Sequence, residues 1–125
     1  MKFFIALLIA SLSNLSIAKS IELDCDYQTY SDQGGNHKVT KPFILGFVID
    51  DTTNKAYEIG SIGVSEVSFI KGIDSYSFIE ITDAGNVMST TIDNSMMSTH
   101  SRNTVISGEI IPSQYYGKCK IKKRT

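Results

Sequence analysis

The sequence predicts an all-β domain, a small antiparallel barrel or sandwich of about eight short strands. Apolar and polar residues alternate in several short runs, as expected for strands with one buried face. Turn-forming residues separate these runs at intervals of about 10 residues. No run after residue 18 has the 3.6-residue spacing of an amphipathic helix. A disulfide between Cys25 and Cys119, the only two cysteines, would close the first strand against the last.

Residues 1–18 are predicted to be a cleaved secretory signal peptide. Lys2 supplies the positive start, residues 3–12 form an apolar core, and Ser16-Ile17-Ala18 places small residues at both recognition positions of a cleavage site. An uncleaved anchor is the alternative, but the apolar core is shorter than the roughly 20 residues of a membrane span. Residues 19–125 are then a single β domain with no stable membrane span.

The composition indicates where such a domain works. The chain has 12 basic and 13 acidic residues, and Lys2 leaves with the signal peptide, which argues against nucleic-acid binding. Two cysteines with none to spare fit an oxidising compartment. The expected location is the periplasm of a Gram-negative bacterium or the medium outside it.

The two cysteine-bearing runs predict how the ends of the domain pair. Setting Cys25 opposite Cys119 in antiparallel strands places Leu23 opposite Ile121. The same register opposes acidic residues to lysines in three pairs, Glu22–Lys122, Asp24–Lys120 and Asp26–Lys118. A parallel pairing would also oppose acid to base. In a further alternative, the two charged runs are unrelated and simply solvated.

The remaining strands are expected between these ends. Residues 31–41 are predicted to be a polar loop, the strand pattern weakens over 94–104, and Pro112 is expected to end one strand before the closing strand begins. Phe43, Leu45, Phe47 and Ile49 should share a buried face. The predicted strands cover residues 21–30, 43–49, 56–59, 64–71, 76–82, 87–93, 105–111 and 113–122.

The early Cys25-x-Tyr27 and the ending Tyr115-Tyr116-Gly117-Lys118-Cys119 resemble a loose group of small secreted proteobacterial β proteins of unassigned function. This resemblance implies export and a β fold, and no activity. A weaker likeness runs to the periplasmic inhibitors of c-type lysozyme, which are small β-barrels with a Tyr-x-Cys signature. Here the tyrosine follows the cysteine, and the inhibitory serine loop of that family has no matching position. No functional residue is therefore carried over.

Chemistry-bearing residues are sparse. His100 and Ser101 are neighbours, so on an extended chain they point to opposite faces and cannot form a nucleophile–base pair. No catalytic residue, metal site or cofactor is predicted. His100 and Arg102 are expected to face solvent, although the Arg102 fork could instead hold an anion or tie down a loop.

A candidate binding patch combines two tyrosines and two methionines with a histidine and an arginine. In each of the pairs Met96-Met97 and Tyr115-Tyr116, one residue should lie in the core and the other outside. The residues of this patch are His100, Arg102, Met96, Met97, Tyr115 and Tyr116.

Three classes of function remain open. The first is a non-catalytic binding or inhibitor module that acts on a protein or a cell-envelope component, which predicts an exposed aromatic or methionine patch and no concave polar pocket. The second is a small-ligand carrier, which predicts an open barrel interior. The third, less favoured, is a hydrolase, which requires titratable groups converging in a cleft.

Overall fold

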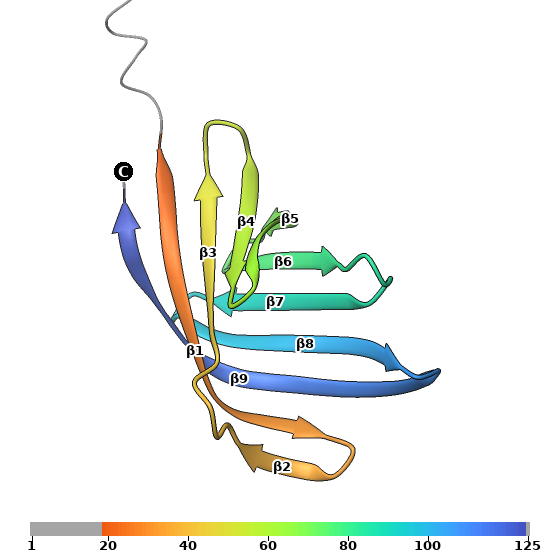
Figure 1. Ribbon diagram of the computed structural model, residues 1–125. Coiled ribbons are helices and arrows are strands. Elements are labelled where there is room, and N and C mark those ends of the chain that lie inside the picture. The colour runs from red at the N-terminus through yellow and green to blue at the C-terminus, as the bar shows by residue number, and fades with distance from the viewer. Residues whose placement is uncertain (1–18, 125) are drawn as a thin grey trace, which may run out of the picture.

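The computed structural model describes residues 19–124, so the predicted signal peptide lies outside the described residues. Every strand pairing in this part of the chain is antiparallel (Figure 1). None of its secondary structure is a helix that could span a bilayer. The strands are β1 (Ser20–Asp32), β2 (Gly35–Lys38), β3 (Ile44–Asp50), β4 (Lys55–Gly60), β5 (Gly63–Lys71), β6 (Ser75–Ile81), β7 (Val87–Asp93), β8 (Met97–Ile106) and β9 (Glu109–Arg124).

The sheet closes on itself. Neighbouring strands follow the order β2-β1-β3-β4-β5-β6-β7-β8-β9, and β1 also pairs with β9. The predicted all-β barrel of about eight strands is thus confirmed, with β2 as an additional strand beside it. The expected loop over residues 31–41 is wrong, because β1 continues to Asp32 and turns directly into β2.

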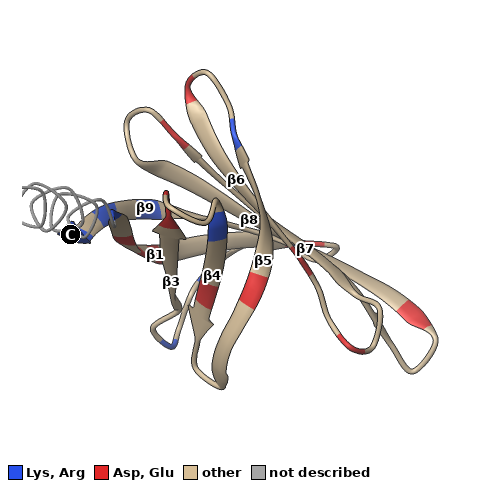
Figure 2. Ribbon diagram, turned by 90° about the horizontal axis from the view of Figure 1, so that it is seen from above, with Lys and Arg blue, Asp and Glu red and all other residues tan. Residues whose placement is uncertain are grey.

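The first and last strands are joined as their cysteines indicate. Cys25 lies opposite Cys119, with the two Cα atoms 3.9 Å apart and the sulfurs bonded. Leu23 lies opposite Ile121, and the antiparallel direction is confirmed. The predicted charge register is confirmed at Asp24–Lys120 and Asp26–Lys118. Figure 2 shows basic residues gathered near the C-terminal end of β9 and acidic ones on β1 beside it.

The third predicted pair differs by one residue. A bulge between Glu22 and Leu23 places Lys123, and not Lys122, opposite Glu22. Lys122 Nζ still lies 3.9 Å from Glu22 Oε1, so the two charges remain close. The bulge adds one residue, Lys122, to β9. A register predicted from regular one-to-one pairing cannot include such an extra residue.

A second irregularity lies at Gln28 of β1, a strand that is bent along its length (Figure 1). Tyr27 lies opposite Gly117 and Thr29 opposite Tyr116, so Gln28 is an extra residue on β1. Before this point the other edge of β1 pairs with β3, and after it with β2. The extra residue also resets the alternation, so Tyr30 faces the same side as Tyr27.

Pro112 does not separate two strands, because β9 runs through it without interruption. The backbone N–H of Cys119 donates to Met96 O, on the side of β8. Backbone groups alternate sides along a strand, so the nitrogen of Pro112 faces the side of β1. There β1 has already ended, at Asp32 opposite Ser113. A proline is tolerated at such a free edge.

The barrel interior is apolar toward one end. The Phe47 and Phe78 rings stack with centroids 4.2 Å apart, and Phe69 stacks on Phe78 at 5.4 Å. The predicted inward face of β3 is confirmed, with Leu45, Phe47 and Ile49 buried and Phe43 packed against them. Also buried in this core are Leu23, Cys25, Tyr27, Ala56, Val67, Ile92 and Cys119.

Residues 94–104, where the strand pattern is weak, contain most of the regular strand β8. The inward residues of β8 include Ser98 and His100, which are polar yet buried. A strand with polar residues on both faces gives no apolar alternation, so the pattern could not identify it.

Candidate functional site at the mouth of the barrel

Toward the other end, the barrel interior becomes polar. Glu58 follows the buried Ala56 by two residues on β4, and Glu80 follows the buried Phe78 by two residues on β6. Arg102 follows the buried His100 on β8 in the same way. Residues two apart on a strand share a face, so three charged groups from alternate strands face the inside of one barrel end.

These groups line a cavity of about 340 Å³. One part of its wall is apolar, with Phe43, Leu45, Val64 and Met88. The turn between β4 and β5 forms part of the rim, where the Ile62 side chain is fully exposed. The other lining residues are Glu58, Gly60, Ser61, Gly63, Ser65, Glu80, Thr82 and Arg102.

Glu58 holds its proton at neutral pH. Burial, a hydrogen bond with Glu80 and the Glu80 charge raise the pKa of Glu58 to about 8. The Arg102 guanidinium acts in the opposite direction and lowers this pKa. With Glu58 protonated, the negative charge of Glu80 balances the positive charge of Arg102, and the mouth is close to neutral.

Arg102 is held in place by aromatic rings. Its Cζ atom lies 4.8 Å from the centroid of the Phe43 ring and 5.0 Å from that of the Tyr115 ring. Both contacts are within the range of cation–π attraction. Its Nε–H group also donates to His100 Nε2, 3.4 Å away. The guanidinium therefore has a fixed position in the cavity that the two carboxyl groups also line.

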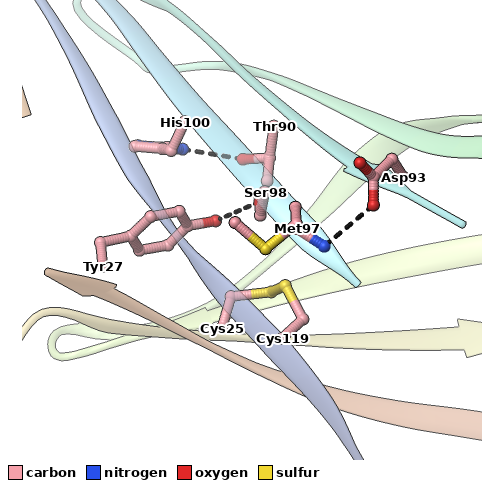
Figure 3. Close-up of a disulfide and its surroundings, with 8 residues drawn as sticks. All are labelled: Cys25, Tyr27, Thr90, Asp93, Met97, Ser98, His100 and Cys119. Carbon is pink, nitrogen blue, oxygen red and sulfur yellow. Dashed lines mark hydrogen bonds between the residues drawn. A yellow bond between two sulfur atoms is a disulfide. The ribbon is translucent and has the colours of Figure 1, made fainter. Parts of the chain in front are cut away.

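His100, the residue that Arg102 contacts, belongs to a buried polar layer, and Figure 3 shows this layer above the disulfide. His100 Nδ1 is 2.7 Å from Thr90 Oγ1, and the Tyr27 hydroxyl is 2.9 Å from Ser98 Oγ. Burial and the Arg102 charge lower the pKa of His100 to about 4. Burial raises the pKa of Tyr27 to about 12. Both side chains are consequently neutral at physiological pH and separate the charged mouth from the disulfide and the apolar core.

The six residues of the candidate patch do not form one surface. His100 is buried, against the expectation that it faces solvent, and the half-buried Arg102 lines the mouth. Met96 and Tyr115 pack against the core, whereas Met97 and Tyr116 lie outside. The expectation that each pair divides between core and exterior is confirmed.

Glu58 and Glu80 are site residues that the sequence pattern did not identify. The available signal was their place in the alternation, because each follows an inward residue by two positions in a strand that was otherwise identified correctly. An acidic residue at an inward position is rarely left buried and unpaired. Such a position indicates either a site or the rim of the barrel.

No group of three or more His, Cys, Asp or Glu side chains within residues 19–124 is arranged to hold a metal ion. Comparisons with protein families, with curated proteins and with solved structures each find no match to this chain.

Proposed function

We propose that this chain is an exported, non-catalytic carrier whose barrel mouth binds a small molecule with a positively charged amino group and an apolar body. The observation that carries the proposal is the carboxyl pair Glu58–Glu80 facing Arg102 in the mouth. A concave polar cavity favours a small-ligand carrier over a module that docks a protein on an exposed patch. Its volume of about 340 Å³ suits a ligand at the small end of the usual range.

The charges select the kind of ligand. Two carboxyl groups and one guanidinium leave a net negative charge if both carboxyls ionise, and the free protein avoids this by protonating Glu58. An ammonium group placed between the carboxyls would replace that proton and restore neutrality. An anion would meet the Glu80 carboxylate beside Arg102 and would be repelled. Binding of a cation should therefore release a proton below the Glu58 pKa.

The cavity wall selects the rest of the molecule. Phe43, Leu45 and Met88 offer apolar contact on the same cavity. A hydrocarbon chain attached to the amino group would bury against them, at about 0.8 kcal/mol for each methylene removed from water. Export to the periplasm or beyond is supported by residues 1–18 and by the disulfide. In that location the ligand would come from outside the cytoplasm.

Isothermal titration calorimetry with hexylamine, and with hexan-1-ol as its uncharged counterpart, tests this function. We expect hexylamine to bind and the alcohol to bind at least about tenfold more weakly, because only the amine replaces the proton between the carboxyls. The enthalpy measured below the Glu58 pKa should depend on the ionisation heat of the buffer, since a proton is released.

Variants locate the binding. Glu80→Gln should weaken hexylamine binding by at least about tenfold. Glu66→Gln is the matched control, because Glu66 lies on the neighbouring β5 with an exposed carboxylate 4.0 Å from Lys55 Nζ, outside the mouth. Equal affinity for amine and alcohol, or no binding of either, would contradict the proposal.

A further inference from the structure

The outer face of four neighbouring strands carries uncharged polar side chains in two parallel ranks. The first rank crosses β7, β8, β9 and β1 through Thr91, Thr99, Tyr116 and Thr29. The second crosses the same strands through Ser89, Ser101, Gln114 and Ser31. We call these two ranks the hydroxyl face.

The alternation of the strands fixes this face on the outside. Between the two ranks lie Thr90, His100 and Tyr115, which point inward, and the first two of these are buried. Charged residues occur at the border of the face, with Lys38 opposite Thr29 on β2, Lys118 two residues beyond Tyr116, and Asp93 two residues beyond Thr91 at the edge of one hollow. The hydroxyl face itself carries no ionisable group except the Tyr116 phenol.

A hydrogen-bond network holds the centre of the hydroxyl face. Ser101 Oγ donates to Gln114 Oε1 over 2.8 Å, which orients the amide so that Gln114 Nε2 donates to the Tyr116 hydroxyl over 3.1 Å. The Ser31 hydroxyl lies 3.1 Å from the same phenol oxygen. The Tyr116 ring is thus fixed before any ligand arrives, which lowers the entropy lost on binding.

The Tyr116 ring stands between two hollows. On one side, Thr29, His37 and Lys38 border a depression of about 550 Å³. On the other, Thr91 and Thr99 border one of about 310 Å³. Tyr116 contributes to both and is 39% exposed. The hollows give a flat ligand room on each side of a fixed aromatic ring.

We propose that the hydroxyl face binds a neutral polysaccharide. Sugar hydroxyls both donate and accept, as do the serine, threonine, tyrosine and glutamine side chains of the face. The apolar C–H side of a sugar ring can pack on the Tyr116 ring. Because each contact is weak against competition from water, a repeating chain that engages several positions at once gains affinity that a single sugar would not.

The same chemistry disfavours other partners. An anionic polymer requires lysines or arginines, and the two ranks contain none. A protein partner favours an apolar centre, and serine is depleted in such interfaces. The neutral charge of the hydroxyl face thus complements a neutral glycan. This binding surface lies on the opposite side of the strands from the mouth and does not depend on its ligand.

Affinity electrophoresis of the oxidised protein tests this inference. Native gels would contain hydroxyethyl cellulose, laminarin, dextran or mannan as neutral polymers, alginate as an anionic one, or no polymer. We expect retardation by at least one neutral polymer and none by alginate. Tyr116→Ala should weaken that affinity by about tenfold, the loss expected for one aromatic contact.

Two further variants keep the test independent of folding. Thr99→Lys places a charge on the hydroxyl face and should weaken retardation, whereas Ser68→Lys, on the exposed side of β5, should not. Circular dichroism melting identifies any variant that fails to fold. Glu80→Gln should leave retardation unchanged, which separates this surface from the mouth. No retardation by any neutral polymer, equal retardation by alginate, or an unchanged affinity in folded Tyr116→Ala and Thr99→Lys would overturn the inference.

Discussion

The Nε–H group of Arg102 donates to His100 Nε2 over 3.4 Å, and this contact determines the protonation of the ring. A guanidinium can only donate, so Nε2 must be the acceptor. The single proton of the neutral imidazole then lies on Nδ1, from which it is donated to Thr90 Oγ1, 2.7 Å away. A second proton on His100 would convert the Arg102 contact into a repulsion between two cations.

Protonation of His100 should therefore destabilise the fold in acid. The pKa is lowered from 6.5 to about 4 in the folded chain, so the unfolded chain binds more protons between these values and stability falls as the pH decreases through this window. We expect a loss of about 2–3 kcal/mol for this group. Urea unfolding of wild type and His100→Gln across the window measures it. An unchanged slope in the variant would contradict the prediction, and His37→Gln controls for the other histidine.

The protonated Glu58 should make the stability of the fold decrease at higher pH. Its folded pKa of about 8 lies above the ordinary value of 4.5, so the folded chain holds a proton that the unfolded chain has lost, and stability falls as the pH rises between these values. Above the ordinary histidine pKa this effect is not opposed by His100. The expected loss is about 1–2 kcal/mol, because solvent at the mouth reduces the full effect. Chemical unfolding of Glu58→Gln should show a flatter profile from pH 6.5 to pH 8, with Glu66→Gln behaving as wild type.

The disulfide should contribute mainly by closing a long loop. Cys25 and Cys119 are 94 residues apart in the sequence, and for a loop of that order the chain-entropy model gives an upper value of about 4–5 kcal/mol. The Cys25→Ser/Cys119→Ser variant should lose up to that amount in urea unfolding while keeping the far-ultraviolet spectrum of a β protein. Reduced wild type is the matched comparison. Equal stability of oxidised and reduced protein would show that strand pairing alone closes the barrel.

The barrel and its closure could be predicted because their signals are local and redundant. The alternation of Leu45, Phe47 and Ile49 identifies one buried face, and two cysteines with matching charged neighbours identify one register. Bulges carry no such signal. The extra residues at Gln28 and beside Glu22 change which side chains face inward without changing the composition of the strand. The sequence pattern therefore does not reveal them.

The mouth could not be assembled from the sequence because its members are far apart along the chain. Glu58, Glu80 and Arg102 lie on β4, β6 and β8, so they come together only when these strands and the two between them have paired. His100 was expected in solvent, but its side chain is satisfied in the interior by Thr90, which lies opposite it on β7, and by Arg102, two residues further along β8. The pairing with Thr90 depends on the register of two strands, which no local pattern gives.

Gly117 tests the bulge that bends β1. A Cβ atom at this position would collide with the carbonyl oxygen of Asp26 and lie 2.7 Å from Tyr27 Cα, and both obstacles are backbone. Gly117→Ala should therefore separate β1 from β9 next to the disulfide and destabilise the domain by about 3 kcal/mol or more. Thermal and urea unfolding followed by circular dichroism measure this loss.

Gly60→Ala is the control for that substitution, because a Cβ there meets nothing within 4 Å and the residue also lies in a strand. It should change stability by less than about 1 kcal/mol. Similar stabilities of the two alanine variants would mean that β1 and β9 do not approach each other closely at the bulge. The bulge at Gln28, which places Tyr30 on the same face as Tyr27, would then need another cause.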